Sequence, residues 1–208
     1  MIHGKFITLE GIDGAGKSTH IAFIADLVRG LNHELVVTRE PGGTPLGEKL
    51  RALVLNENMH ADTETLLMFA ARCEHVEQVI RPALLEGQWV ISDRFTDASY
   101  AYQGGGRGMA DSRLRQIEQW TLGDLEPDLT LLFDLDPVIA KSRQANAGLA
   151  PDRFEQEQQV FFRNAREKYL QRAATFPQRI KVLDAALSVV EIRVQINALI
   201  SSLDITRA

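Results

Sequence analysis

The chain has 208 residues, a net charge of −5 at neutral pH and one cysteine, Cys73. A domain of this length buries roughly 70 % of its unfolded surface, so a core can form without disulfides. The negative charge argues against a general nucleic-acid-binding protein, which is usually basic. The lone cysteine fits a reducing cytosol, and neither a signal peptide nor an apolar run of about 18 residues is evident. We therefore expect a cytoplasmic protein that binds neither membrane nor nucleic acid.

Short apolar runs alternate with longer helical patterns along the chain. The expected strands are residues 6–10, 35–38, 89–93, 129–136 and 180–184. The expected helices are residues 17–28, 62–85 with a kink or break at Pro82, 111–122, 137–145, 155–176 and 189–203. Apolar strands separated by helices predict βαβ units, and continuous apolar runs predict strands that are buried on both faces. The predicted fold is α/β, with a five-stranded parallel sheet flanked by helices on both faces and residues 1–208 in one domain.

Ligands of such sheets bind beyond the carboxyl ends of the strands. The chemistry is therefore expected just after Glu10, Thr38, Asp93, Asp134 and Asp184.

A phosphate-binding motif follows the first predicted strand. Residues 11–18 read GIDGAGKS, a complete G-x-x-x-x-G-K-S between a strand and a helix. Its glycines let backbone N–H groups turn toward an anion, and the helix that follows adds its positive dipole end. Lys17 is expected to reach the β- and γ-phosphates and the Ser18 hydroxyl to bind Mg²⁺. The predicted triphosphate-binding residues are Gly11, Ile12, Asp13, Gly14, Ala15, Gly16, Lys17, Ser18 and Thr19.

Other motifs separate a kinase from the other P-loop classes. A GTPase-type switch normally carries N-K-x-D and D-x-x-G, but the chain has no N-K-x-D and reads DRFT from Asp93 onward. The L-S-G-G-Q signature of transporter-type motors is also absent. A kinase for a small phosphorylated acceptor needs a second anionic site, mobile arginines and exclusion of water.

Candidates for that second site follow the second and third strands. Residues 39–44 read REPGGT, for which an ordinary turn is the alternative interpretation. Asp93 stands where a contact to Mg²⁺ is expected, and Arg94 can hold a phosphate in a bidentate manner, a strand-terminal salt bridge being the alternative. Phe69 and Arg72 share a helix face suited to a base, or to core packing.

Two further segments contain candidate residues for the kinase site. Ser99, Tyr100, Tyr102 and Gln103 precede a glycine-rich segment, residues 104–108, which we expect to be a flexible loop. Residues 141–153 read KSRQANAGLAPDR and have the character of a mobile lid that carries Arg143 and Arg153, a solvated loop being the alternative.

Together these motifs resemble the thymidylate kinases from the first strand to the last. The matching segments are LEGIDGAGKST, TREPGGT, FAAR, DRF, AYQGGGRG, DRFE and LDA. The resemblance implies a P-loop NTPase fold with a mobile lid and a homodimer that uses Mg²⁺. It also implies transfer of the γ-phosphoryl group of ATP to dTMP, which supplies dTTP synthesis. Another P-loop nucleoside-monophosphate kinase, a deoxynucleoside kinase and a non-catalytic nucleotide-binding regulator are the alternatives.

The resemblance also implies roles for individual residues. The implied catalytic residues are Lys17, Asp13, Arg94, Arg143 and Arg153, and the implied metal-binding residues are Ser18 and Asp93. Ala15 stands where some members have an arginine, so the lid arginines take over, as in the bacterial pattern. The helices at residues 62–85 and 111–122 are the implied dimer surfaces.

For the acceptor, the resemblance places Asp13 at the sugar and Arg94 at the phosphate. Phe69 stacks on thymine, Arg72 bonds its O4 and Tyr102 crowds the 2′ position. The implied substrate-binding set is Glu40, Pro41, Phe69, Arg72, Arg94, Ser99, Tyr100, Tyr102 and Gln103.

Three features depart from the family pattern. The family ring often lies four residues before the arginine, a position that Met68 holds here. The lid is poor in arginine, and Phe95 replaces the usual tyrosine or histidine after Arg94.

Overall fold

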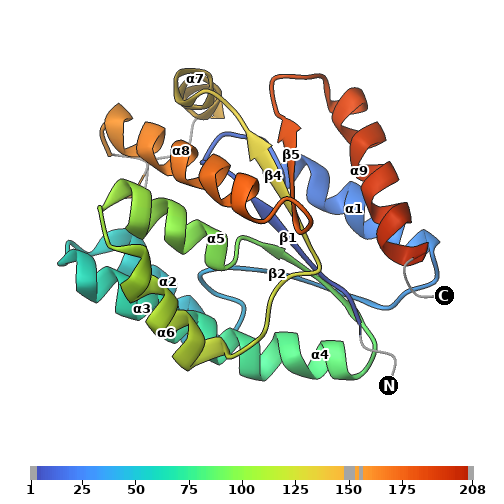
Figure 1. Ribbon diagram of the computed structural model, residues 1–208, viewed down its shortest axis with the longest axis horizontal. Coiled ribbons are helices and arrows are strands. Elements are labelled where there is room, and N and C mark those ends of the chain that lie inside the picture. Colours follow the sequence, from blue (N-terminus) through green and yellow to red (C-terminus); the bar gives the residue numbers. More distant parts are fainter. Residues whose placement is uncertain (1–3, 148–152, 155–156, 206–208) are drawn as a thin grey trace.

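A five-stranded parallel sheet lies at the centre of the computed structural model, which describes residues 4–147, 153–154 and 157–205 (Figure 1). Its strands stand in the order β2-β3-β1-β4-β5. The register places Thr8 of β1 beside Ser92 of β3 and Thr130 of β4. The strands are β1 (Phe6–Glu10), β2 (Leu35–Arg39), β3 (Trp89–Asp93), β4 (Leu129–Asp134) and β5 (Ile180–Asp184).

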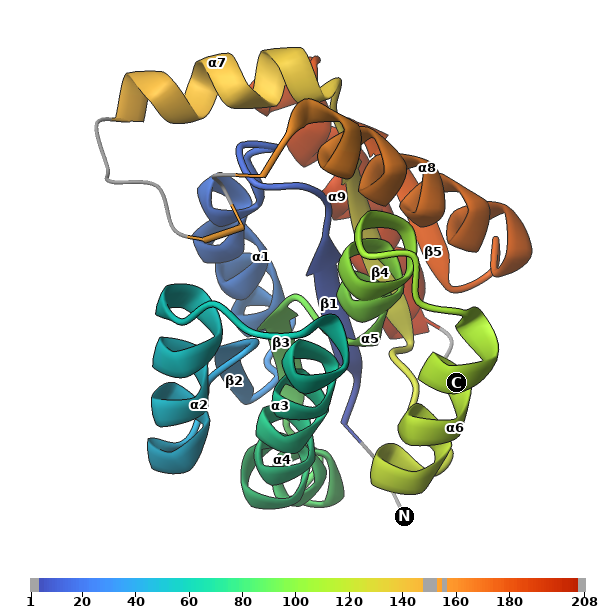
Figure 2. The same ribbon diagram turned by 90° about the vertical axis from the view of Figure 1, so that its left-hand side faces the viewer.

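Helices cover both faces of the sheet, which confirms the predicted α/β fold. On one face α1 (Lys17–Gly30) packs against α9 (Val189–Ile205). The opposite face carries α3 (Ala61–His75), α4 (Arg81–Leu85), α5 (Thr96–Ser99), α6 (Asp111–Leu122) and α8 (Gln159–Thr175) (Figures 1 and 2). Helix α2 (Pro45–Asn56) packs against α3, and α7 (Pro137–Ala147) lies beyond the carboxyl end of β4.

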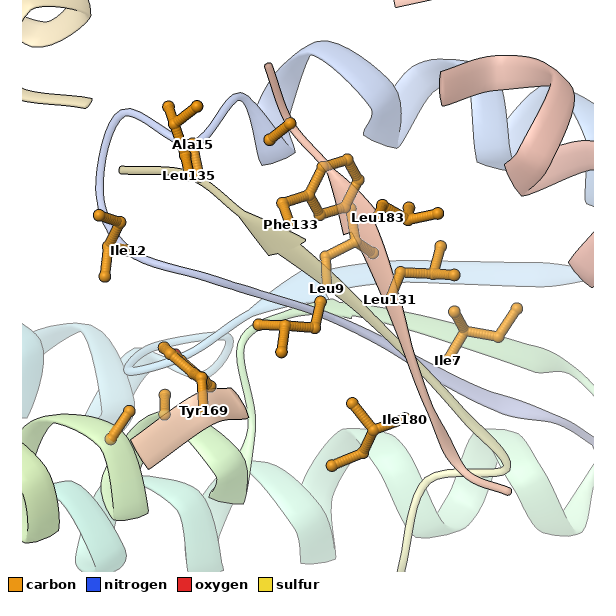
Figure 3. Packing of buried hydrophobic residues seen from close by; sticks show 14 of the residues in the cluster. Ile7, Leu9, Ile12, Ala15, Leu131, Phe133, Leu135, Tyr169, Ile180 and Leu183 are labelled. Atoms are coloured by element: carbon orange, nitrogen blue, oxygen red, sulfur yellow. The ribbon is translucent and has the colours of Figure 1, made fainter. Parts of the chain in front are cut away.

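The core lies on the central strands. Ile7, Leu9 and Leu131 are fully buried, and their side chains point into the layers between sheet and helices (Figure 3). The edge strands differ, because Val37 of β2 and Val182 of β5 are 43 % and 45 % exposed. The expectation that every strand is buried on both faces is therefore wrong for β2 and β5, the two edge strands of the sheet.

Helix α2 was not expected from the apolar pattern. Its start nevertheless carries the usual signals, since the Thr44 hydroxyl accepts a hydrogen bond from the Gly47 N–H at 2.9 Å and Pro45 opens the first turn. The helix places its inner face against the acceptor side of the site described below.

Residues 104–106 of the glycine-rich segment are helical, which corrects the expectation of a flexible loop for this part of residues 104–108. A π-helix, η2 (Tyr100–Gly106), runs through it and packs against α8. A Cβ atom at Gly106 would lie 2.3 Å from the Phe161 ring, and one at Gly105 would lie 2.6 Å from the Asn164 carbonyl oxygen. These glycines allow two helices to approach closely.

The expected helix over residues 62–85 is continuous but changes type. A π-helical segment, η1 (Val76–Ile80), joins α3 to α4 just before Pro82, which has no N–H to donate to the preceding turn.

The expected lid falls partly outside the described residues. Residues 141–147 continue helix α7, whereas residues 148–152 lie outside the description, so lid mobility stays a prediction. Residues 155–156, the expected start of the next helix, also lie outside it, and α8 begins at Gln159. Among the helices that are described, none has the length and apolarity needed to cross a membrane.

Leu131→Ala tests the central position of β4. Removing this fully buried side chain should lower the free energy of unfolding by about 2–5 kcal/mol, because it leaves a cavity in a close-packed core. The matched change Val182→Ala on the edge strand should cost less than about 1 kcal/mol. Urea denaturation measures both, and equal losses would contradict the assignment of core and edge.

Candidate active site

The phosphate-binding loop joins β1 to α1, as the motif predicts. Gly16 caps the start of α1 with φ 93°, a conformation that favours glycine. The Lys17 ammonium folds back over the loop and donates to the carbonyl oxygens of Gly11 and Ile12 at 2.8 and 3.1 Å. The loop thus places a lysine and a helix N-terminus at one point, which suits a phosphate group.

A cavity of about 810 Å³ opens over this loop. Residues 13–20 form one wall, and Asp93 and Arg94 enter from the end of β3. Arg143 and Gln144 of α7 form another wall. The volume is in the range of nucleotide pockets, and we refer to this space as the donor cavity.

The donor cavity has an apolar side that the sequence analysis did not assign. It is formed by Ala185, Leu187, Val189 and Ile192, which follow β5. The only signal for them in the sequence was their position after the carboxyl end of the last strand.

A second cavity, of about 70 Å³, lies on the other side of Arg94, and we refer to it as the acceptor cavity. Asp13 and Arg94 line both cavities. The remaining lining comes from α2, α3, α5, η2, the loop after β2 and the segment at residues 153–154, and consists of Glu40, Pro41, Arg51, Leu55, Met68, Ala98, Tyr102, Gln103 and Phe154.

Asp13, Arg94 and Tyr102 form a hydrogen-bonded triangle between the two cavities. Arg94 donates to Asp13, and the Tyr102 hydroxyl donates to the second oxygen of Asp13 at 2.9 Å. Arg94 also lies 3.3 Å from the Tyr102 hydroxyl. Burial opposes ionisation of Asp13, but the charges of Arg94 and Lys17 outweigh it and lower the pKa of Asp13 to about 2. Asp13 is therefore ionised throughout the neutral range.

The backbone of Arg94 adopts a left-handed conformation, with φ 75°. Hydrogen bonds hold it on both sides: its N–H donates to Leu9 O at 2.9 Å, and Ser92 Oγ donates to its carbonyl at 2.7 Å. The next N–H, of Phe95, donates to the buried carboxyl group of Glu10 at 2.7 Å. Burial and the charge of Asp97 raise the pKa of Glu10 to about 8. These bonds direct the Arg94 guanidinium into the boundary between the cavities.

Ser18 and Asp93, the residues predicted to hold Mg²⁺, line the donor cavity together. Asp93 Oδ1 is buried and lacks a hydrogen-bond partner among the described residues, as expected of an oxygen that serves a cation or its water. No group of three or more histidine, cysteine or acidic side chains suited to a metal occurs in the described part of the chain. A hydroxyl group, one carboxylate and nucleotide phosphates are the ligand set that Mg²⁺ ordinarily uses, so these residues fit it.

The predicted acceptor residues divide into two groups. Glu40, Pro41, Arg94, Tyr102 and Gln103 line the acceptor cavity, whereas Phe69, Arg72, Ser99 and Tyr100 do not.

Arg72 and Ser99 lie behind the cavity wall. The Arg72 guanidinium is buried and donates to Glu40 at 2.6 Å, to Ser99 Oγ at 2.9 Å and to the Phe95 carbonyl at 3.0 Å. It also stacks over the Phe69 ring, 4.8 Å from the centroid. In this structure Arg72 therefore buttresses Glu40 from behind the lining of the cavity, and its direct contact with a base stays a prediction.

Phe69 and Tyr100 do not line the acceptor cavity in this structure, so their expected contacts with the base stay predictions. Both pack with Leu114 in a separate cluster, and the Tyr100 hydroxyl donates to Glu118 at 2.6 Å. Met68 lines the cavity instead. A step of one residue turns a helix by about 100°, so Phe69 cannot share the inward direction of Met68.

The two lid arginines lie in different places. Arg143 lines the donor cavity and donates to the Ala185 carbonyl at 3.1 Å. Arg153 lies outside the lining of that cavity and donates to Glu64 at 2.7 Å and to Val54 O at 2.9 Å. The expected catalytic position of Arg153 is thus not observed.

Arg51 and Leu55 were missed because α2 was missed. Both line the acceptor cavity, and Arg51 donates to the Pro41 carbonyl at 2.9 Å. The capping signal at Thr44 and Pro45 is the feature of the sequence that would have located them.

The family model described as thymidylate kinase matches residues 9–196. The chain belongs to the thymidylate kinase family. Among curated relatives, a thymidylate kinase from Cupriavidus metallidurans is 58 % identical, covering 97 % of this chain and 100 % of its own length. One from Bordetella petrii is 56 % identical, covering 96 % of both chains.

A solved structure of similar fold is also a thymidylate kinase. The crystal structure of thymidylate kinase from Ehrlichia chaffeensis superimposes with a TM-score of 0.76 at 30 % identity, covering 95 % of this chain and 99 % of the other. The sheet and its flanking helices are thus those of the thymidylate kinase family.

Lys17 makes nucleotide binding dependent on pH. Burial and the nearby Arg94 charge lower the pKa of Lys17 to about 8, so the free protein loses this positive charge as the pH rises through 8. ATP affinity should fall by up to about tenfold per pH unit above that value, because binding must then return a proton to the lysine.

Calorimetric titration with ATP between pH 7 and 9.5 measures this effect. Lys17→Arg is the matched control, since a guanidinium remains charged over the range, and its affinity should change much less. A flat profile for the unmodified protein would contradict the prediction.

Proposed function

We propose that this chain transfers the γ-phosphoryl group of ATP to dTMP, giving ADP and dTDP, and so supplies dTTP synthesis. The observation that carries the proposal is that two cavities of different size meet at Asp13 and Arg94. A donor phosphate from one side and an acceptor phosphate from the other would face each other there. Membership of the thymidylate kinase family supports the same reaction.

In this proposal ATP occupies the donor cavity. Its phosphates follow the loop to Lys17, and its base lies toward the apolar side near Leu187 and Ile192. Ser18 and Asp93 would hold Mg²⁺, which when bound neutralises charge on the β- and γ-phosphates. Arg143 stands on the opposite wall, where its guanidinium can approach the transferred group.

The acceptor phosphate pairs with Arg94 in the proposed complex. A phosphate monoester has its second pKa near 6, so it is mostly dianionic at neutral pH and already a nucleophile. No general base is required, and catalysis consists of positioning and charge stabilisation by Lys17, Arg94 and Arg143.

The thymidine part of the acceptor occupies the acceptor cavity. Nucleotide pockets ordinarily measure about 300–1,000 Å³, so this cavity of about 70 Å³ must open when dTMP enters. Tyr102 lies beside Asp13 at the sugar position, and Met68 faces the base. The Gln103 Oε1 atom is buried without a partner among the described residues and would accept a hydrogen bond from the base.

A coupled ADP-release assay with ATP, Mg²⁺ and individual acceptors tests the proposal. Release that depends on dTMP, with a weaker response to dUMP, is the expected result. Preference for dGMP would indicate another monophosphate kinase, and preference for thymidine a deoxynucleoside kinase. ATP hydrolysis without dependence on any acceptor would favour a nucleotide-binding regulator.

Lys17→Ala should abolish dTMP-dependent turnover, with a loss of at least about a hundredfold in kcat, because the lysine neutralises charge on the transferred group. The fold should persist, since the change removes a buried ammonium whose pKa is already lowered by burial. The ADP-release assay and thermal melting followed by circular dichroism measure the two effects. Near-normal kcat in a folded variant would refute the assigned role.

We also infer a cytoplasmic homodimer that forms through α3 and α6. Leu66 and Trp120 are 55 % and 82 % exposed on these helices and line a shared hollow of about 420 Å³ with Met109 and Ile117. Exposed apolar side chains that gather on one face favour association. The single cysteine supports the cytoplasmic location, because a reducing compartment does not favour disulfides.

Trp120→Glu should shift the protein from dimer to monomer, because a charge would be buried in the proposed interface. Light scattering coupled to size exclusion measures the mass. Val190→Glu on α9, where Val190 is 72 % exposed on the other face of the sheet, is the control and should leave the mass unchanged. A monomeric unmodified protein would overturn the inference.

A further inference from the structure

A buried carboxylate, Glu64, connects the acceptor cavity with two arginines. Glu64 lies in the first turn of α3 and is fully buried. It accepts hydrogen bonds from Gln103 Nε2 at 2.8 Å, from Arg107 Nε at 3.2 Å and from Arg153 Nη2 at 2.7 Å. Of these donors only Gln103 lines the acceptor cavity.

The contacts determine which way the Gln103 amide faces. A carboxylate paired with two guanidinium groups can only accept hydrogen bonds, so the amide must turn its NH₂ group toward Glu64. Its oxygen, Oε1, is then directed elsewhere, and it is buried with no partner in the described part of the chain. The amide therefore has an unused acceptor, Oε1, that a ligand in the acceptor cavity can pair with.

The surrounding structure leaves Gln103 little freedom. Gln103 is fully buried in η2, whose glycines pack tightly against α8. Arg107 is held in turn by Glu157 at 2.5 Å and lies over the Phe161 ring. The orientation of the amide is thus set by Glu64 and not by the ligand.

An acceptor at this position distinguishes pyrimidines by their N3 atom. The N3 atom of thymine and uracil carries a hydrogen and can donate to the Gln103 oxygen. The N3 atom of cytosine is unprotonated and is itself an acceptor, so it cannot pair with that oxygen. A site with a buried polar group rejects a base that leaves the group unpaired much more strongly than an apolar site does.

We propose that Glu64 is a specificity-determining positioning residue, which holds the Gln103 amide so that the acceptor cavity takes bases with an N3–H group and rejects cytosine. This inference rests on the proposed function, because it concerns the acceptor of the same reaction. Glu64 itself does not line the acceptor cavity.

Glu64→Gln tests the proposal with dTMP and 5-methyl-dCMP, which share the methyl group and differ only at the N3 and C4 edge. A neutral amide at position 64 can donate or accept, so Gln103 becomes free to turn over. The ratio of kcat/KM for dTMP to that for 5-methyl-dCMP should fall at least tenfold. Most of the change should appear as a higher KM for dTMP and a lower KM for 5-methyl-dCMP.

Two controls separate orientation from general damage. Glu157→Gln makes the same chemical change at the other partner of Arg107, and the ratio should stay within twofold of its original value. In a Gln103→Leu background, adding Glu64→Gln should leave the ratio unchanged, since the amide through which Glu64 acts is absent. A tenfold fall in either control would overturn the proposal.

The unmodified protein provides a test that does not depend on how the variants fold. It should use 5-methyl-dCMP and N3-methyl-dTMP far less well than dTMP. Equal use of dTMP and 5-methyl-dCMP, or an unchanged ratio in folded Glu64→Gln, would overturn the role of Glu64. Failure of the unmodified protein to release ADP with dTMP would instead refute the proposed function.

Discussion

The ion pair between Arg94 and Asp13 is the interaction on which the rest of the site depends. It joins the phosphate-binding loop to the end of β3 and stands where the two cavities meet. Arg94 occupies a left-handed backbone conformation that costs about 1–3 kcal/mol at a residue other than glycine. The hydrogen bonds of Leu9, Ser92 and the Glu10 carboxyl group hold that conformation. The left-handed backbone conformation thus places the Arg94 guanidinium between the donor cavity and the acceptor cavity before any ligand binds.

Buried carboxylates with arginine partners stiffen the acceptor side. Glu40 binds Arg72 and His75, Glu64 binds Arg107 and Arg153, and Asp97 binds Arg172 and Arg179. Removing one partner from such a pair ordinarily costs about 3–5 kcal/mol, because a charge is left buried and unpaired. The donor side differs, since its large cavity is partly lined by apolar residues that follow β5. The acceptor side therefore combines a small cavity with buried ion pairs behind its lining residues.

Much of the site was predictable where its chemistry is local in the sequence. The loop from Gly11 to Ser18 carries its own glycines, lysine and helix start, and the structure places it at the predicted edge of the sheet. Predictions failed where the direction of a side chain depends on contacts with residues far away in the sequence. Met68 and Phe69 are both apolar and adjacent, and only the packing of α3 against α6 and η2 decides which of them faces the cavity.

The sequence by itself determined the parallel α/β sheet, the phosphate loop and the family to which the chain belongs. The tertiary structure alone decided that residues 104–106 are helical, that Arg153 binds Glu64 and that Arg72 lies behind the cavity wall. The physical reason is the range of the interactions. Strand propensity, helix caps and glycine turns act over a few residues, whereas the pairing of buried charges and the close approach of η2 to α8 join segments that are far apart in the chain.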